Sequence, residues 1–162
     1  MQHNARVTVL SITITFVIAL VFYLFAYSWM TKRQTGRGPW QVTFTNSFGT
    51  PALVINQPAL GITNVLIRFT GESLAPTQQL DTVAFTKPQM RTPFGEVIYD
   101  DLMFLPGTVT LDCFGHEVEM IPRHLVLNRR PVPWTSNTTN DLAAAAKLPP
   151  EQRKQVKGGY RK

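Results

Sequence analysis

Hydrophobic and polar residues follow two different periods along this chain. From Val7 to Met30 the chain has no charged residue and no proline. After Pro39, apolar and polar residues alternate in short runs that glycine and proline separate. A long uncharged apolar run is typical of a transmembrane helix, and alternation with a period of two is typical of strands with one buried face. The pattern predicts a mainly β protein in which one membrane helix precedes a small antiparallel β-sandwich or barrel-like domain.

The apolar run is long enough to cross a bilayer. A helix of about 24 residues reaches ~36 Å, more than the ~30 Å of a hydrocarbon core. Tyr27 and Trp29 stand near its C-terminal end, where amphipathic rings favour the membrane interface, and Lys32 and Arg33 follow. We expect these four residues to mark the membrane boundary. A cleaved signal peptide is the alternative, although its apolar region usually has only about 7–15 residues.

Two small polar residues lie inside this predicted span. Ser11 and Thr15 are four residues apart, so they share one face of the helix. Such residues let a second transmembrane helix approach closely or accept a hydrogen bond from it, which makes them candidates for helix packing. The alternative is hydrogen bonding to the backbone of their own helix.

The side of the membrane that carries the β domain is the least constrained feature. Three basic residues follow the helix and Arg6 precedes it, which favours a cytoplasmic domain by the positive-inside rule. However, long domains translocate largely regardless of charge. A short segment before one anchor and a β domain without disulfides is a common bacterial extracytoplasmic arrangement. We therefore expect a bacterial inner-membrane protein with an extracytoplasmic domain.

The same pattern divides the chain into five parts. They are an N-terminal tail (1–6), the membrane helix (7–30), a linker (31–39), the β domain (40–134) and a basic tail (135–162) that is partly disordered or forms a short helix. Within the β domain we predict strands at residues 40–45, 52–56, 62–70, 80–86, 96–99, 102–105, 107–113, 117–121 and 124–128. Their spacing is typical of a sandwich or a small barrel.

The distribution of charge narrows the possible partners. The chain carries 16 basic and 10 acidic residues, a net charge of +6. Residues 39–134 hold six of the basic and eight of the acidic residues, so the domain itself has a net charge of −2 and each flank has +4. A nucleic-acid-binding domain is expected to be basic on its own folded surface, so we predict no nucleic acid partner. We expect integral membrane subunits and the bilayer as partners, with anionic headgroups at the basic tail.

One short motif has metal-ligand chemistry. Cys113, His116 and Met120 are spaced as Cys-x2-His-x3-Met. This spacing resembles the C-terminal ligand loop of cupredoxins, and the resemblance implies copper held by these three side chains in a β-sandwich. The cupredoxin pattern also needs a histidine from an earlier strand, whereas the other histidines here are His3 and His124. The alternative is a hairpin in which Cys113 and Met120 are ordinary core residues. Under this alternative we expect no cofactor.

Other polar residues have plainer explanations. Asp100 and Asp101 are adjacent, and adjacent residues of a strand face opposite ways, so we expect them in a turn rather than as paired catalytic carboxylates. Glu117 and Glu119 share one strand face, which we expect to be solvated. Cys113 is the only cysteine, so the chain has no intramolecular disulfide.

These observations favour a function without catalysis. We expect an accessory or scaffolding subunit, anchored by a single membrane pass, that stabilises a larger membrane protein complex through its helix and its β domain. The alternative is an extracytoplasmic, membrane-tethered sandwich that binds a small ligand or a metal at the cupredoxin-like loop.

Overall fold

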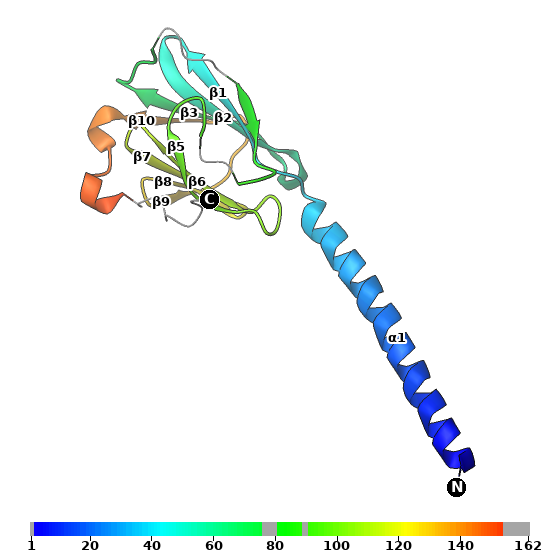
Figure 1. The fold of residues 1–162 in the computed structure, drawn as a ribbon. Coiled ribbons are helices and arrows are strands. Elements are labelled where there is room, and N and C mark those ends of the chain that lie inside the picture. The colour runs from blue at the N-terminus through cyan, green and yellow to red at the C-terminus, as the bar shows by residue number, and fades with distance from the viewer. Residues whose placement is uncertain (1, 76–80, 89–90, 154–162) are drawn as a thin grey trace. The chain divides into compact units, whose positions relative to one another are not determined.

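The computed structural model describes residues 2–75, 81–88 and 91–153, and within the N-terminal helix it describes side chains from Leu10 to Lys32. The chain divides into two compact units, Met1–Gly36 and Arg37–Lys162. The first unit is one apolar helix and the second is a two-sheet β domain (Figure 1). The predicted fold class is confirmed.

Helix α1 (Gln2–Thr35) contains one stretch, Leu10–Lys32, that is long and apolar enough to cross a membrane. The mean hydropathy of this stretch is 2.2, and none of its most apolar window is buried within the chain. The helix includes most of the predicted tail and runs past the predicted end at Met30, because no glycine or proline interrupts it before Gly36. The predicted linker 31–39 is therefore shortened to residues 36–39.

The β domain is a sandwich of two five-stranded sheets (Figure 1). The first sheet has the strand order β10-β3-β2-β1-β4 and the second has β5-β6-β7-β8-β9. All neighbouring strands are antiparallel except β10, which runs parallel to β3. The strands of the first sheet are β1 (Gln41–Ser47), β2 (Thr50–Gln57), β3 (Ile62–Thr70), β4 (Thr82–Ala84) and β10 (Thr139–Ala143). The strands of the second sheet are β5 (Glu96–Asp101), β6 (Thr108–Cys113), β7 (His116–Ile121), β8 (His124–Leu127) and β9 (Arg130–Val132). The described residues also form three short 3-10 helices, η1 (Pro58–Leu60), η2 (Ala144–Ala146) and η3 (Pro150–Gln152).

Alternate residues of both sheets fill one core between them. In β1, Val42 and Phe44 are buried while Gln41 is exposed, as the period of two predicts. The hairpin of β6 and β7 repeats the pattern, because Leu111 is paired with Val118 and both are fully buried. Residues from both sheets belong to one contiguous hydrophobic cluster, so each sheet buries the apolar face of the other.

The β domain extends beyond its predicted end at Trp134. Residues 139–143 form β10 at an edge of the first sheet, where Leu142 is paired with Phe69 and is buried. Arg68 and Asp141 join the two strands by a pair of hydrogen bonds of 2.7 and 2.8 Å. The predicted tail therefore supplies a strand and η2 and η3, whereas residues 154–162, which carry four of its basic groups, lie outside the described residues.

Three local predictions of the sequence analysis are wrong. Residues 102–105 form no strand, because Asp101 of β5 is paired with Thr108 of β6 and the six residues between them must connect the two strands. Asp100 and Asp101 end β5 rather than forming a turn. Glu117 is buried rather than solvated, whereas Glu119 on the same face of β7 is partly exposed.

Candidate interaction site at the linker end

The linker joins the sandwich at one end, which we call the linker end. There the indole of Trp40 is fully buried, donates a 2.9 Å hydrogen bond to the Gly107 carbonyl and stacks on Trp134 with ring centroids 5.2 Å apart. The side-chain amide of Gln57 donates to the carbonyls of Gly38 and Pro39, at 3.1 and 2.9 Å. These contacts fix the start of the domain to both sheets.

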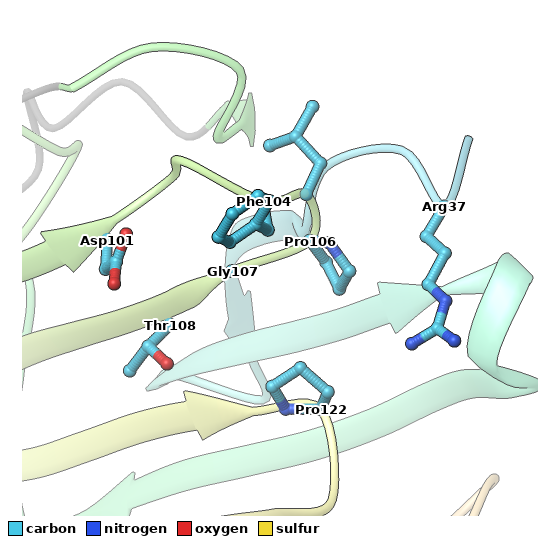
Figure 2. Close-up of a pocket in the computed structure, with 8 residues that line it drawn as sticks. Arg37, Asp101, Phe104, Pro106, Gly107, Thr108 and Pro122 are labelled. Atoms are coloured by element: carbon cyan, nitrogen blue, oxygen red, sulfur yellow. The ribbon is translucent and has the colours of Figure 1, made fainter. Parts of the chain in front are cut away.

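A shallow cleft of about 250 Å³ opens at this end (Figure 2). Arg37 lies on one side of the cleft, and Phe104 and Pro106 of the loop between β5 and β6 lie beside it. Asp101, Thr108 and Pro122 complete the principal lining. Small-molecule pockets usually have volumes of about 300–1,000 Å³, so this cleft is at the small end even for a compact ligand.

The loop at residues 102–107 presents apolar side chains to solvent. Met103 is 78% exposed and Phe104 is 50% exposed. The loop is nevertheless held in place, because the backbone N–H of Met103 donates to the Asp101 carboxylate at 3.2 Å and Gly107 accepts the bond from Trp40. Gly107 has a φ of +68° and packs so closely on Asp101 that an added Cβ would lie 2.1 Å from its carbonyl oxygen. An ordered, exposed apolar loop is a feature of contact surfaces.

Three cations lie at this end of the sandwich, where Asp100 and Asp101 also end β5. Arg37 and Arg123 are exposed, and Arg123 follows Pro122 of the cleft lining. Lys87 is also exposed and lies two residues after Phe85, whose backbone N–H donates to Trp40. Within the described residues the ion pairs are Arg68–Asp141 and Lys147–Glu72, so none of these three cations is paired. We call Arg37, Lys87, Met103, Phe104 and Arg123 the linker-end surface.

Two residues of the metal-ligand motif, Cys113 and His116, lie at the opposite end of the sandwich, which we call the far end. Cys113 and His116 are paired across the β6–β7 hairpin, but Met120 lies four residues further along β7, about 13 Å from His116 by strand geometry. Burial raises the pKa of the Cys113 thiol, which therefore stays protonated and poorly suited to bind a metal. No group of three or more potential metal-binding His, Cys, Asp or Glu side chains occurs among the residues that the structure describes.

His116 makes a different contact. Asn128 accepts a hydrogen bond from the Glu117 backbone through its amide oxygen at 3.0 Å, so its amide nitrogen faces His116 Nδ1 at 3.0 Å. Nδ1 then accepts, and the proton of the neutral ring lies on Nε2. Burial is the main cause that lowers the pKa of His116, and the Lys147 cation adds to it. The ring also packs on Phe69 with centroids 5.9 Å apart, which is a core position.

Residues 144–153, which we call the strap, close the far end; they include η2 and η3 and appear in orange to red in Figure 1. Leu148 is buried, and its backbone N–H donates to Gly115 at 3.1 Å. Lys147 pairs with Glu72 at 2.6 Å, and Asn128 donates to the Ala146 carbonyl at 2.8 Å. The strap therefore covers the β6–β7 hairpin at the far end, whereas Met103 and Phe104 at the linker end are exposed.

The predicted helix residues keep their positions on α1. Tyr27 and Trp29 are 61% and 57% exposed, and Lys32 is exposed at the end of the apolar stretch. The Arg33 side chain lies outside the described residues. The Thr15 hydroxyl donates a 2.9 Å hydrogen bond to the Ser11 carbonyl. This is the alternative named in the sequence analysis, in which these residues bond to the backbone of their own helix. Helix packing through Ser11 and Thr15 stays a prediction.

Comparisons with protein-family models, with curated proteins and with solved structures give no match. Functional inference therefore rests on the residues of this chain.

Sequence reasoning missed the linker-end surface. The sequence pattern places Arg37 in the linker and predicts a strand at residues 102–105. One signal could have revealed the loop: Pro106 and Gly107 follow directly, and proline lacks the N–H that a central strand needs. The grouping of Arg37, Lys87 and Arg123 has no counterpart in the sequence, since these residues are far apart along the chain.

Proposed function

We propose that this protein is a non-enzymatic accessory subunit of a larger membrane protein complex, held in the bilayer by α1 and contacting other subunits through both α1 and the β domain. One observation carries the proposal. Every residue from Leu10 to Met30 except Ala26 is exposed, and the sandwich completes its own core without any part of α1. An apolar surface of this size needs lipid or protein around it.

Features of the domain support a contact role. Phe48 is 102% exposed at the tip of the β1–β2 hairpin, at the far end of the sandwich from Met103. Large apolar side chains on ordered turns commonly contact partner proteins or membranes. The hairpin tip therefore offers a contact to a partner that is separate from the linker-end surface.

We propose further that α1 is retained as a permanent anchor in a bacterial inner membrane, with the domain outside the cytoplasm. The length of the apolar stretch, 23 residues, supports retention over cleavage, because the apolar region of a signal peptide is shorter. Fusions of alkaline phosphatase and of green fluorescent protein after Arg153 would test the orientation. Active phosphatase with a dark fluorescent protein supports it, and the opposite pair contradicts it.

The subunit proposal is tested by purification of the full chain from native membranes in a mild detergent. We expect integral membrane proteins to co-purify in fixed ratio. The matched control replaces Leu10–Met30 by a leucine-alanine helix of equal length, which keeps the anchor but removes the side chains that recognise a partner. Loss of the partners from this variant supports a role for α1. A free monomer from both chains would overturn the proposal.

A second candidate is the membrane-tethered ligand-binding module, and the observation that favours it is the linker-end cleft. Arg37 and Asp101 give the cleft one group of each charge. A thermal-shift screen of the full chain against metals, sugars and zwitterionic metabolites would test it, because a ligand that binds only the folded state raises the melting temperature. The absence of any shift in the wild type would remove this candidate.

A further inference from the structure

We propose that the linker-end surface lies against the headgroup layer of the bilayer, with Met103 and Phe104 in the interfacial region and Arg37, Lys87 and Arg123 on phosphate groups of anionic phospholipids. The inference rests on the proposed membrane anchoring by α1. It adds a second membrane contact, made by the β domain itself.

Chain length keeps this surface near the bilayer. Arg37 follows Lys32, the last residue of the apolar stretch, by five residues. Even a fully extended chain of five residues spans at most about 18 Å. The headgroup layer on each side of a bilayer is itself about 5–8 Å thick. Arg37 lines the cleft beside Phe104, so the loop at residues 102–107 shares this restriction.

The chemistry of the surface matches the interfacial layer. Phe104 and Met103 are apolar side chains that project from an ordered loop, and aromatic residues favour the boundary between hydrocarbon and headgroups. Basic side chains beside such a boundary are attracted to anionic lipids. Residues 39 to 134 have a net charge of −2, and at this end Arg37, Lys87 and Arg123 stand against the two aspartates Asp100 and Asp101.

The one acidic group of the cleft is already engaged. Asp101 accepts a hydrogen bond from the backbone N–H of Met103, which holds the loop in the conformation that exposes Met103. The carboxylate therefore shapes the loop, and the guanidinium of Arg37 is left to bind an anion. Arginine binds phosphate oxygens in a bidentate geometry, which suits a phosphodiester headgroup.

A protein occupant fits less well. Stable protein interfaces bury about 800 Å² on each partner. The apolar part of the linker-end surface consists of two side chains, which falls well below that area. A fluid headgroup layer needs no such continuous apolar surface, because interfacial contact combines a few inserted side chains with charge attraction.

The experiment places nitroxide spin labels on the full chain in lipid nanodiscs. Met103→Cys carries the label at the linker end, where Met103 is 78% exposed, and Phe48→Cys carries the comparison label on a far-end turn, where Phe48 is 102% exposed. The native Cys113 is buried with a raised pKa, so the unmutated chain serves as the blank for background labelling. Accessibility to oxygen reports lipid, and accessibility to a water-soluble nickel chelate reports solvent.

In nanodiscs of phosphatidylcholine with phosphatidylglycerol, we expect the ratio of oxygen to nickel accessibility at residue 103 to be several-fold higher than at residue 48. Adding Arg37→Gln or Arg123→Gln to the Met103→Cys chain should each weaken the contact about fivefold, which is the effect of one basic residue near an anionic surface. In nanodiscs of pure phosphatidylcholine, the ratio of oxygen to nickel accessibility at residue 103 should also be lower than in the anionic nanodiscs.

Three results would overturn the inference: equal ratios at the two positions, a ratio at 103 that ignores both the arginines and the anionic lipid, or shielding of residue 103 from both reagents, which means a protein cover. Circular dichroism of each labelled chain shows whether the sandwich is intact. Failure here leaves the subunit proposal standing, since co-purification of membrane partners tests that proposal independently.

Discussion

The two ends of the sandwich differ in how their apolar residues are covered. At the far end, Phe69, Phe94 and Phe114 pack against one another, and the strap closes over the β6–β7 hairpin through Leu148. At the linker end, Trp40 is buried, but the cleft is open to solvent and Met103 and Phe104 are exposed. The difference shows that the strap covers the β6–β7 hairpin at the far end, whereas no described segment covers Met103 and Phe104 at the linker end.

The hydrogen bonds at the two ends of the sandwich also hold different parts of the chain. Hydrogen bonds at the far end join the strap to turns of the sheet, so they stabilise the domain. At the linker end, the bonds of Trp40 and Asp101 hold a backbone loop whose side chains point outward. Rigidity behind an exposed side chain reduces the entropy lost when that side chain makes a contact.

The largest expected effect is loss of the indole that supports the linker end. Trp40→Ala removes a fully buried ring, its stacking on Trp134 and its bond to Gly107. We expect the free energy of unfolding of the β domain to fall by about 3–5 kcal/mol. Urea unfolding of the full chain in micelles, followed by circular dichroism, measures it. Phe48→Ala is the control, and its fully exposed side chain should change stability by less than about 0.5 kcal/mol.

A glycine substitution sharpens the role of the loop. Gly107→Ala places a Cβ 2.1 Å from the Asp101 carbonyl at a φ of +68°, whereas Gly61→Ala meets open space at a nearly equal φ of +70°. We expect Gly107→Ala to cost about 2–3 kcal/mol because of the clash and Gly61→Ala only about 1 kcal/mol because of the backbone strain. Equal melting temperatures for the two variants would show that the loop is not fixed as the structure has it.

The strap gives the corresponding test at the far end. Leu148→Ala removes the buried side chain that holds it, and we expect a loss of about 2 kcal/mol in the free energy of unfolding. Lys147→Ala breaks only the partly exposed pair with Glu72, which is worth about 0–1 kcal/mol. If both variants unfolded at the wild-type urea concentration, the strap would not be a stabilising part of the domain.

The smallest expected effect is a pH dependence at the far end. Because burial lowers the pKa of His116 in the folded state, its neutral form favours folding fully at neutral pH and above. Below the ordinary histidine value of about 6.5, the unfolded chain binds the proton first, so stability falls as pH decreases toward the folded pKa. The groups that face the ring are Lys147, Glu72, Asp112 and Asn128.

His116→Gln is the matched variant for this prediction, since glutamine keeps a neutral polar side chain without a titrating ring. Its melting temperature should change less between pH 7 and pH 5 than that of the wild type. The same slope in both chains would assign the pH dependence to other groups.

Much of the fold was predictable from local pattern. The alternation of Val42 and Phe44 with polar neighbours placed β1 correctly, and Ile62–Thr70 matches β3 at both ends. β10 was missed because Thr139–Ala143 contains one buried apolar residue, Leu142, so its pattern resembles a polar tail. A strand of this kind is recognised only by its pairing with β3, a contact between residues about 70 positions apart.

The candidate site was less predictable than the fold. The motif of Cys113, His116 and Met120 is evident in the sequence, but strand geometry separates Met120 from the other two. The linker-end surface, in contrast, joins residues of the linker, of the segment after β4 and of two turns. Sequence periodicity reports which face of one element is apolar, and it carries no information on which turns of different strands meet.

The sequence by itself determined the apolar helix, the mainly β class of the domain and its alternating core, because each follows from hydrophobic periods that are local along the chain. The choice of a two-sheet sandwich over a barrel came from the tertiary structure. Only the tertiary structure decided that the strap closes the far end, that Met103 and Phe104 are exposed, and that Arg37, Lys87 and Arg123 belong to one end. These features depend on strand pairing and on loop closure between residues that are distant in the sequence. The burial of the whole core stabilises those pairings, so no local segment specifies them.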